Sequence, residues 1–476
     1  MKTTEDLPLA GAPGGNRPAP PRQRTSKATR AALFVTVPLL LLALIFRFPG
    51  HLPCPGHGWR PSRPQTIEER VKHILNHTPL IDGHNDLAIF IRAFYNNRIY
   101  NESFSDAFAN GGLPGHVDLP RLRAGMNGGA FWSVFWPCPT NGSDYSDSNY
   151  TPIVQQTLQQ IDLLTRLRHA HPHTFLPPTL PSRTALHHHL LHHPGNRPLI
   201  SPLGIEGLHQ IGNSAATLRQ FHALGVRYAT LTHNCGNAFA DAALWERPLR
   251  KAPSVWGGVS PAGRRLVREM NRLGVLVDLA HTSVDTMRDV LGGAGDGWEG
   301  SAAPVVFSHS SVYAICPHPR NVPDDVLGLV KERGGLVMVN FNPEFVSCVE
   351  GKGGDGLPEF YPGNSTLAQV ARHVVYIGEK IGWEHVGFGS DFDGIESTPE
   401  GLEDVSKFPA LVGELLRQGV GHEDVAKVVG GNLFRVWGEV ERVAAEMQKE
   451  GVPVLEDDLP GLFANGLWGE SAEREL

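Results

Sequence analysis

Histidine and carboxylate side chains follow a series of short apolar runs in this 476-residue sequence, at the positions where the runs end. Imidazole and carboxylate groups are the ligands that Zn²⁺ and similar divalent ions prefer. A single H-x-D pair or an isolated histidine is more typical of a structural role, but their recurrence after successive apolar runs predicts a metal site. The candidate ligands are His84, Asp86, Glu206, His281 and His309.

The one glutamate in this set indicates a site for two metal ions. A carboxylate among four other ligands can bridge a pair of ions, and two ions ~3.5–4 Å apart can hold a hydroxide between them. Such a hydroxide attacks a carbonyl carbon, and the reaction then needs an oxyanion stabiliser and an acid for the leaving amine. His233 is placed for the first task and Asp391, two residues before Asp393, for the second.

The apolar runs predict eight strands, and stretches with helical spacing lie between most of them. Continuous apolar strands that alternate with helices are typical of a parallel sheet covered on both faces. Eight such units indicate a TIM-type (β/α)8 barrel, in which the C-terminal ends of the strands converge on one mouth. A doubly wound open sheet would need a Gly-rich phosphate loop after its first strand, and none is found. The runs are 79–82, 130–136, 198–207, 228–233, 274–281, 303–310, 334–341 and 385–394, and the helical stretches are 152–169, 214–224, 261–273, 283–292, 323–333 and 366–381.

The composition agrees with a folded α/β protein. Hydrophobic residues are 41% and charged residues 19%, which excludes a disordered chain, and the net charge of −7 argues against a nucleic-acid partner. Residues 402–418 and 421–447 have helical spacing, and we expect them to pack outside the barrel. We therefore predict a barrel domain over 66–447 and an irregular C-terminal tail over 448–476.

The N-terminal region differs from the rest of the chain. Residues 1–30 hold six basic and two acidic residues among many Pro, Gly and Ala, which predicts a disordered cytosolic tail. Residues 31–46 are uncharged, and we interpret 31–48 as a signal-anchor transmembrane helix followed by a linker over 49–65. The alternative is a cleaved signal peptide, but its n-region is usually short and no A-x-A site follows cleanly. The prediction is a single-pass type II membrane protein with a lumenal or extracellular catalytic domain.

Two further features fit that location. N-x-[ST] sequons predict glycosylation, although such triplets also occur by chance. Four of the five cysteines could pair, which leaves Cys54, near the membrane segment, as the odd one. The sequons begin at Asn76, Asn101, Asn141, Asn149 and Asn364, and the other cysteines are Cys138, Cys235, Cys316 and Cys348.

Eight motifs, in order along the chain, resemble those of the membrane (renal) dipeptidases, the M19 family of metallopeptidases. They extend from about residue 66 to about residue 440, which is well over three-quarters of the chain. Eight spaced motifs in the right order form a highly specific match. The motifs are LIDGHND, GIEGLHQIGNS, TLTHNC, LVDLAHTS, FSHSS, RNVPDDVL, MVNF and GFGSDFDGI.

The resemblance implies a barrel of the metal-dependent amidohydrolase kind that holds two zinc ions per chain. It implies that His84 and Asp86 bind the first zinc ion, that Glu206 bridges both ions, and that His281 and His309 bind the second. Relatives in this family often form dimers, so a homodimer is a further implication.

The same resemblance assigns the residues that contact substrate. It implies that His233 stabilises the transition state, that Arg320 binds the substrate carboxylate, and that Asp391 is the acid–base residue. It also implies two disulfide bonds, Cys138–Cys235 and Cys316–Cys348. From the residues alone, Arg320 in RNVPDD would be a surface arginine in a loop that caps a helix, but a guanidinium is also the group that binds a carboxylate in a fork.

Two segments depart from the family pattern. The sequence GNAFADAA at 236–243 replaces a Pro-Trp pair that relatives usually carry, and this loop is expected to border the substrate pocket. Residues 169–193 hold eight of the 23 histidines and could bind metal ions. Because prolines interrupt this segment and no carboxylate or cysteine accompanies it, we predict a solvated insertion between the second and third strands.

We therefore predict a zinc-dependent dipeptidase that hydrolyses the peptide bond of dipeptides through a metal-bridging hydroxide. One alternative is a related dinuclear metal amidohydrolase that acts on D-aminoacyl, cyclic amide or cysteinyl-glycine substrates and has no need of Arg320. Another is a non-catalytic surface binding protein, which should have lost a ligand or Asp391, and this sequence retains all of them. The predicted partners are dipeptides and a membrane.

Overall fold

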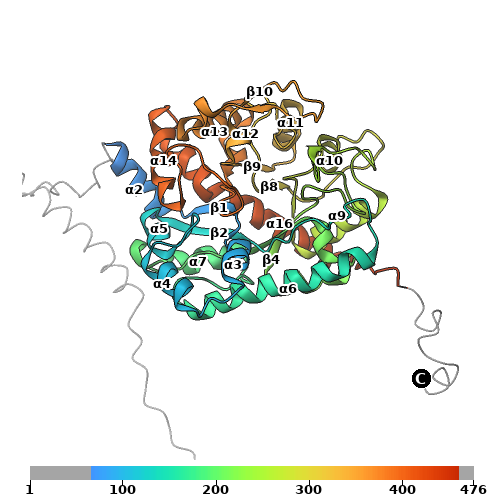
Figure 1. The fold of residues 1–476 in the computed structure, drawn as a ribbon, viewed down its shortest axis with the longest axis horizontal. Coiled ribbons are helices and arrows are strands. Elements are labelled where there is room, and N and C mark those ends of the chain that lie inside the picture. The colour runs from blue at the N-terminus through green and yellow to red at the C-terminus, as the bar shows by residue number, and fades with distance from the viewer. Residues whose placement is uncertain (1–65, 460–476) are drawn as a thin grey trace, which may run out of the picture. The chain divides into compact units, whose positions relative to one another are not determined.

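Figure 1 shows the fold in a computed structural model, which describes residues 66–459. The predicted cytosolic tail, transmembrane helix and linker, residues 1–65, lie outside the described residues, as does the end of the predicted C-terminal tail. Within 66–459, no helix combines the length and the apolar character that a membrane crossing requires.

Eight parallel strands form one sheet in the order β1-β2-β3-β4-β7-β8-β9-β12. The two outer strands meet where Asn85 pairs with Phe392 and the Asp86 amide donates to the Phe392 carbonyl at 2.9 Å, so the sheet closes into a barrel. Each of the eight strands overlaps one of the predicted apolar runs, and the predicted TIM-type barrel is confirmed. The strands are β1 (Leu80–Asn85), β2 (Asn127–Ser133), β3 (Leu203–Glu206), β4 (Val226–Thr230), β7 (Leu276–Asp278), β8 (Val306–Phe307), β9 (Leu336–Val339) and β12 (Val386–Phe388).

The strand register brings the C-terminal ends of neighbouring strands to one level. Glu206, the last residue of β3, pairs with Thr230, the last residue of β4. Thr230 pairs in turn with Asp278, the last residue of β7. Residues that directly follow these strands therefore lie around a common mouth, as the sequence predicted.

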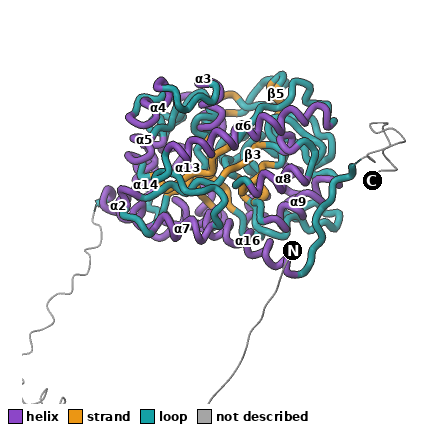
Figure 2. Tube along the Cα trace, turned by 90° about the horizontal axis from the view of Figure 1, so that it is seen from below, coloured by secondary structure: helices purple, strands orange, loops and turns teal. Residues whose placement is uncertain are grey.

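Helices surround the strands (Figure 2). The predicted helical stretches are confirmed, with bounds that shift by a few residues. They are α6 (Asp147–Ala170), α8 (Ala215–Ala223), α9 (Pro261–Leu273), α10 (Val284–Val290), α11 (Asp324–Glu332), α13 (Leu367–Ile381) and α14 (Phe408–Arg417).

Further helices lie in segments for which the sequence analysis predicted none. Thr66 and Glu69 form a capping box at the start of α2, and the side chains of Asn101 and Asp118 cap α4 and α5. These caps are recognisable start signals. The helices are α2 (Ile67–His77), α3 (Leu87–Tyr95), α4 (Glu102–Asn110), α5 (Leu119–Ala124), α7 (Ser182–Leu190) and α12 (Pro343–Val346). Two short antiparallel hairpins are also present, β5 (Leu244–Glu246) with β6 (Leu249–Lys251) and β10 (Cys348–Val349) with β11 (Glu359–Phe360).

The His-rich insertion at 169–193 is solvated, as predicted, but it is also partly folded. Six of its eight histidines are exposed. It contains α7, whose first residue, Ser182, donates from its amide and its hydroxyl to the Glu441 carboxylate at 2.8 and 2.6 Å. His189 is buried, and its Nδ1 lies 2.8 Å from the Pro198 carbonyl. The insertion is therefore attached to the barrel at both ends of α7.

The predicted helix at 421–447 is interrupted, and its second half does not lie among the outer helices. It consists of α15 (His422–Ala426), a π-helical segment (Lys427–Gly431) and α16 (Asn432–Lys449). The interruption falls at Gly430, where a Cβ atom would lie 2.2 Å from the Pro79 carbonyl oxygen. The chain passes directly under the start of β1 at this position, and only glycine fits there.

Helix α16 closes the N-terminal end of the barrel. Its buried residues, Leu433, Val436, Trp437 and Val440, form one apolar cluster with side chains from the early parts of the strands. Phe131 of β2 lies with its ring 5.4 Å from that of Trp437. The strand residues in the cluster include Ile81, Phe131, Tyr228, Leu276, Val306 and Leu336.

Candidate active site

The five predicted metal ligands converge at the C-terminal mouth of the barrel. His84 lies on β1 and Asp86 directly follows it, Glu206 ends β3, and His281 and His309 follow β7 and β8. All five are buried. His84, Asp86 and Glu206 offer ligand atoms within 4.8 Å of one another, and so do Glu206, His233 and His281.

Glu206 lies between two sets of ligands, with one carboxylate oxygen facing each set. Its Oε2 is 3.6 Å from His84 Nε2, which in turn is 3.0 Å from Asp86 Oδ2. Its Oε1 is 2.9 Å from His281 Nε2 and 3.4 Å from His309 Nε2. This is the arrangement that a carboxylate shared by two cations requires.

The second set of ligands presents two imidazole lone pairs to the same point. His281 Nδ1 lies 2.8 Å from the Asn234 side-chain carbonyl oxygen, which only accepts, so this nitrogen carries the proton. Ser308 Oγ donates to Asp278 at 2.6 Å, so it accepts from His309 Nδ1 at 2.9 Å. Both Nε2 atoms therefore have free lone pairs, yet they lie 2.9 Å apart, a contact that a shared cation would relieve.

The first set of ligands carries an excess of negative charge. Burial lowers the pKa of His84, but the carboxylates of Glu206 and Asp86 outweigh it and raise that pKa to about 10. Burial raises the pKa of the Glu206 carboxyl well above its usual value. Asp86 Oδ1 is buried without a hydrogen-bond partner. Both sets of side chains therefore fit bound cations, and their donor atoms are those that zinc prefers.

His233 lies beside the second set of ligands. Its Nε2 is 4.0 Å from Glu206 Oε1, and its ring lies 4.3 Å from that of His281 and 4.7 Å from that of Phe135. Burial lowers the pKa of His233 well below its usual value, so the ring is neutral at pH 7 and can donate one hydrogen bond. The ring is partly exposed, which leaves it accessible from the mouth.

Asp391 approaches the site from the opposite side. Its Oδ1 is 3.9 Å from His84 Nε2, and its Oδ2 accepts from Asn340 Nδ2 at 3.0 Å. Its backbone has φ of 65°, in the left-handed region that non-glycine residues rarely adopt, and its amide donates to the His84 carbonyl. Burial raises the pKa of Asp391 to about 6, so this carboxyl can exchange a proton near neutral pH.

Asp393, which follows in the same segment, does not join the cluster. Its Oδ1 accepts from the His116 amide at 2.6 Å and lies 3.3 Å from His116 Nδ1. The two aspartates of the DFD motif therefore have different environments, and only the first faces the metal ligands.

Arg320 is a buried cation without a partner. Arg320 is 1% exposed, and none of its three guanidinium nitrogens has a hydrogen-bond partner within residues 66–459. Burial lowers its pKa to about 10, although Asp391 and Glu206 oppose that shift. A buried charge of this kind is costly unless it is matched, so this position fits an anionic group of a ligand.

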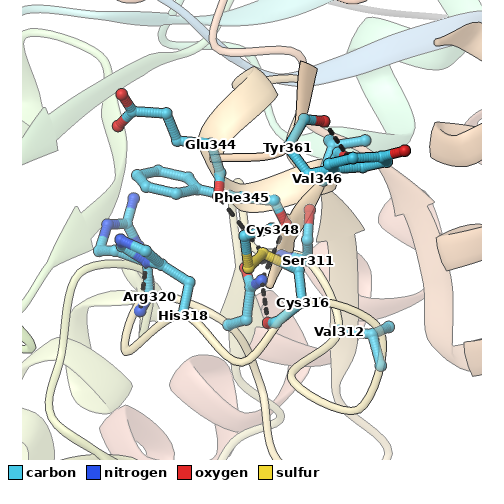
Figure 3. Close-up of a disulfide and its surroundings, with 12 residues drawn as sticks. Ser311, Val312, Cys316, His318, Arg320, Glu344, Phe345, Val346, Cys348 and Tyr361 are labelled. Atoms are coloured by element: carbon cyan, nitrogen blue, oxygen red, sulfur yellow. Dashed lines mark hydrogen bonds between the residues drawn. A yellow bond between two sulfur atoms is a disulfide. The ribbon is translucent and has the colours of Figure 1, made fainter. Parts of the chain in front are cut away.

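A disulfide bond fixes the loop that carries Arg320. Figure 3 shows Cys316–Cys348 beside Arg320, and the Phe345 ring over both Arg320 and His318. Phe345 lies 5.3 Å from the guanidinium carbon and 4.4 Å from the His318 ring. The Arg320 amide donates to His318 Nδ1 at 3.2 Å. The guanidinium is thus held between a ring and a cross-linked loop.

The second predicted disulfide, Cys138–Cys235, is also present. Cys138 Sγ lies 3.8 Å from His233 Nδ1, so this disulfide contacts the ring predicted to stabilise the transition state. Both predicted pairings are confirmed. Cys54 lies outside the described residues.

The loop at 236–243 borders the site, as predicted. The Ala243 amide donates to the His281 carbonyl at 2.7 Å, and Asn237 Nδ2 donates to the Leu231 carbonyl at 2.8 Å. The Asp241 carboxylate accepts from the amides of Val255, Trp256 and Gly258. The loop is therefore tied both to a metal-ligand segment and to the segment around Trp256.

Two buried aspartates that were not predicted hold the ligand-bearing segments in place. Asp278 accepts from Thr230 Oγ1 at 2.5 Å and from Ser308, and Ser308 contacts His309. Asp82 accepts from the Ser390 amide at 2.7 Å and from its hydroxyl, which joins β1 to the segment that carries Asp391. Both lie within three residues of a predicted ligand, in LIDGHND and LVDLAH, which is the signal that could have identified them.

The predicted glycosylation sites are in different environments. Asn101 and Asn141 are exposed, whereas Asn76, Asn149 and Asn364 are half-buried. Asn149 Nδ2 donates to the carbonyls of Asn141 and Asp144 at 3.0 and 2.7 Å. A glycan on Asn149 would have to break at least one of these two hydrogen bonds, because the glycosidic bond replaces one of the two hydrogens on that nitrogen.

Comparison with known proteins gives consistent results. The family model described as membrane dipeptidase (peptidase family M19) matches residues 68–451. The dipeptidase aclJ of Aspergillus oryzae is 43% identical over 454 residues, which are 94% of this chain and 96% of that protein. An uncharacterized dipeptidase of Schizosaccharomyces pombe is 44% identical over 429 residues, covering 89% of this chain and 94% of that protein.

Solved structures share the fold. A metallo peptidase from Rhodobacter sphaeroides, liganded with a phosphinate mimic of the dipeptide L-Ala-D-Ala, superposes with a TM-score of 0.61 at 25% identity, over 76% of this chain and 99% of that chain. The probable dipeptidase PvdM from Pseudomonas aeruginosa has a TM-score of 0.65 at 22% identity, over 80% and 100% of the two chains.

Proposed function

We propose that this chain, which belongs to the membrane dipeptidase family (peptidase family M19) and is a metal-dependent dipeptidase, cleaves dipeptides at a site for two zinc ions. His84 and Asp86 would hold one ion, His281 and His309 the other, and Glu206 both. When bound, the ions would supply a water activated at neutral pH and a Lewis acid for the carbonyl oxygen.

The observation that carries this proposal is the position of the Glu206 carboxylate. Its two oxygens face separate ligand sets, at 3.6 Å from His84 Nε2 and at 2.9 Å from His281 Nε2. A site for a single ion would leave one of these sets with buried polar groups that no cation matches, at a cost in stability. The facing lone pairs of His281 and His309 support the same conclusion.

The chain's own residues would perform the remaining steps. His233, neutral and partly exposed, would donate a hydrogen bond to the oxygen that becomes negative as the carbonyl carbon is attacked. Asp391 would take up the proton of the attacking water and return it to the leaving amine nitrogen. Arg320 would bind the free carboxylate at the C-terminal end of the dipeptide in a fork.

The restriction to dipeptides rests on Arg320. Its unmatched guanidinium lies within the electrostatic range of Glu206 and Asp391, and so near the reacting groups. A carboxylate bound there fixes how far the substrate extends beyond the cleaved bond on the C-terminal side, and a closed pocket on the other side would complete the restriction to dipeptides. The Rhodobacter sphaeroides relative, which is liganded with a mimic of a dipeptide, supports this substrate class.

The test of this assignment compares two substrates in the wild type and in two variants of Arg320. Arg320→Ala should lower kcat/KM for a dipeptide, because a buried charge pair is broken. The loss should correspond to an activation free energy that is higher by about 2–5 kcal/mol. Arg320→Lys keeps the charge but not the fork and should be intermediate. The matching dipeptide amide lacks the carboxylate, so it should be a poor substrate of the wild type and should change little in the variant. Equal losses for the acid and the amide would show that Arg320 does not bind the carboxylate.

We also propose a type II membrane topology with glycosylation of the catalytic domain. The basic residues before the apolar segment 31–46, the two disulfides and the exposed sequons at Asn101 and Asn141 support it. Alkaline carbonate should leave the protein in the membrane pellet, and endoglycosidase should lower its mass. Release of a soluble protein that starts near residue 50 would indicate a cleaved signal peptide instead.

A further inference from the structure

A cleft of about 690 Å³ lies at the opposite end of the barrel from the metal ligands. Its walls are the end of α2, helix α5, Met126 with Asn127 at the start of β2, and residues from 172–199, a segment that includes most of the His-rich insertion and the residues that follow it. The metal ligands follow the C-terminal ends of the strands, whereas this cleft borders their N-terminal ends. Its volume is in the range of small-molecule sites, ~300–1,000 Å³.

Among the residues that the structure describes, those that line the cleft include cationic side chains and no carboxylate. Arg197 is fixed at the rim, because its Nε donates to the His192 carbonyl at 3.1 Å and its Nη1 to the Asn76 carbonyl at 2.8 Å. Neither partner neutralises its charge. The Arg123 side chain is exposed and makes no hydrogen bond or ion pair with any residue in 66–459, whereas Arg121, on the same helix, pairs with Asp118 at 2.9 Å.

The floor of the cleft is apolar. Leu119 and Leu122 of α5 are buried beneath it, and Leu199 is buried in the opposite wall. Met126 is half-buried and lines the same space. A ligand that fills the cleft would therefore place an apolar body on these side chains and a negative group at the arginines on the rim.

The three histidines in the lining do not form a metal site. His189 Nδ1 contacts the Pro198 carbonyl and His192 Nδ1 contacts the His188 carbonyl, so the rings are directed to different backbone partners. Among the described residues, the groups of potential ligands whose atoms lie within 4.8 Å of one another do not include His173, His189 or His192. The permanently charged side chains in the lining are therefore its two arginines, Arg123 and Arg197.

We propose that this cleft is a second ligand site, which binds a small organic anion with an apolar body. Arg123 and Arg197 pair with the anionic group, and Leu119, Leu122, Met126 and Leu199 contact the body. The proposal gives a role to the insertion at 169–193, which the hydrolytic site does not use. It does not depend on the dipeptidase assignment, since none of these residues contacts the metal ligands.

Three probes of related chemistry test the proposal by equilibrium dialysis on the full chain. Naphthalene-2-sulfonate has both an apolar body and a charge, 2-naphthol has the body alone, and inorganic sulfate has the charge alone. Every protein carries Asn76→Gln, so that no glycan at this sequon covers the cleft. The sulfonate should bind one site per chain more tightly than either of the other probes. Equal binding of the sulfonate and the naphthol would overturn the proposal.

Variants locate the binding. Arg123→Gln should weaken sulfonate binding roughly threefold to fivefold, as expected for an exposed charge pair, and Arg123→Gln with Arg197→Gln roughly tenfold or more. Arg268→Gln, an exposed arginine on α9, is the matched control and should change nothing. Arg320→Gln tests the only competing anion site described above and should also leave the affinity unchanged. Undiminished binding in Arg123→Gln, which removes no structural contact, or loss of binding in Arg320→Gln, would refute the assignment.

Discussion

The two ends of the barrel are built on the same eight strands, but opposite kinds of side chain fill them. At the N-terminal end, α16 places Trp437 and its neighbours against Phe131, Leu276 and other strand residues in a continuous apolar cluster. At the C-terminal end, the buried side chains are histidines, carboxylates and an arginine, several of them without a partner.

This difference shows how the fold separates stability from chemistry. Burial of apolar surface stabilises the N-terminal end by roughly 25 cal/mol per Å², and this contribution does not depend on how the side chains are oriented. The C-terminal end holds like charges and facing lone pairs together, which is unfavourable until cations bind. His281, Asp391 and Asp393 there also have positive φ values of 63°, 65° and 67°. The apolar cluster at the N-terminal end therefore offsets the folding free energy that is lost at the C-terminal end.

The strongest test of this comparison is removal of the shared carboxylate. Glu206→Gln should lower the zinc content at both positions and reduce turnover to background, because each ligand set loses its common anion. Metal analysis of the purified protein should give close to two zinc ions per chain for the wild type. Glu269→Gln removes a buried glutamate that pairs with Arg272, far from the mouth, and should keep both ions. A wild type that is fully active with one zinc ion would contradict the dinuclear site.

A smaller effect is expected from Asp391, the carboxylate that we propose as the acid–base group. Asp391→Asn keeps the shape of the side chain but cannot exchange a proton, so kcat should fall about 10²–10⁴-fold while the zinc content stays the same. The control is Asp393→Asn, since that carboxylate binds His116 and not the metal ligands. If Asp391→Asn turned over within a few-fold of the wild type, another group would have to carry the proton.

The opposite end should respond in stability rather than in rate. Trp437→Ala should lower the free energy of unfolding by about 3–5 kcal/mol, as large-to-small changes of buried aromatic residues do. Its kcat at a temperature where the variant stays folded should be unchanged. Trp437→Phe should cost less, because the indole N–H that it removes has no hydrogen-bond partner. Urea unfolding and steady-state kinetics on the same samples measure both quantities, and a fall in kcat for Trp437→Ala would show that the two ends are coupled.

The smallest predicted effect concerns the support of one metal ligand. Ser308→Ala removes the hydroxyl between Asp278 and His309, so zinc affinity should fall about 10–100-fold, with little loss of folding stability. Ser310→Ala is a close control, because its hydroxyl is buried without a hydrogen-bond partner. Competition with a chelator measures the affinity, and equal behaviour of the two variants would argue against a positioning role for Ser308.

The strands and the metal ligands were predictable for the same physical reason. Strands of a parallel barrel are buried on both faces, so they read as apolar runs, and ligands stand out as polar residues where those runs end. The runs overstate the strands, as 303–310 shows, since only Val306–Phe307 is β8. The polar end of that run, Ser308 and His309, is the part that serves the site.

Other features depend on contacts that a single sequence does not display. Arg320 reads as a surface residue of a loop, and only the fold turns its side chain inward under Phe345. Asp82 and Asp278 resemble metal ligands by type and position, but serine and threonine hydroxyls occupy their oxygens. The course of α16 under the barrel follows from the close approach of Gly430 to Pro79, which no local pattern specifies.

The placement of the two disulfides bears on how such an enzyme could diversify. Cys316–Cys348 and Cys138–Cys235 tie together the loops that carry Arg320 and contact His233, while the five proposed zinc ligands lie at strand ends that need no cross-link. A substitution in these cross-linked loops should therefore change the surroundings of Arg320 and His233 while leaving the five strand-end residues in place. The GNAFADAA segment, which directly follows Cys235 and contacts the His281 backbone, lies in such a loop.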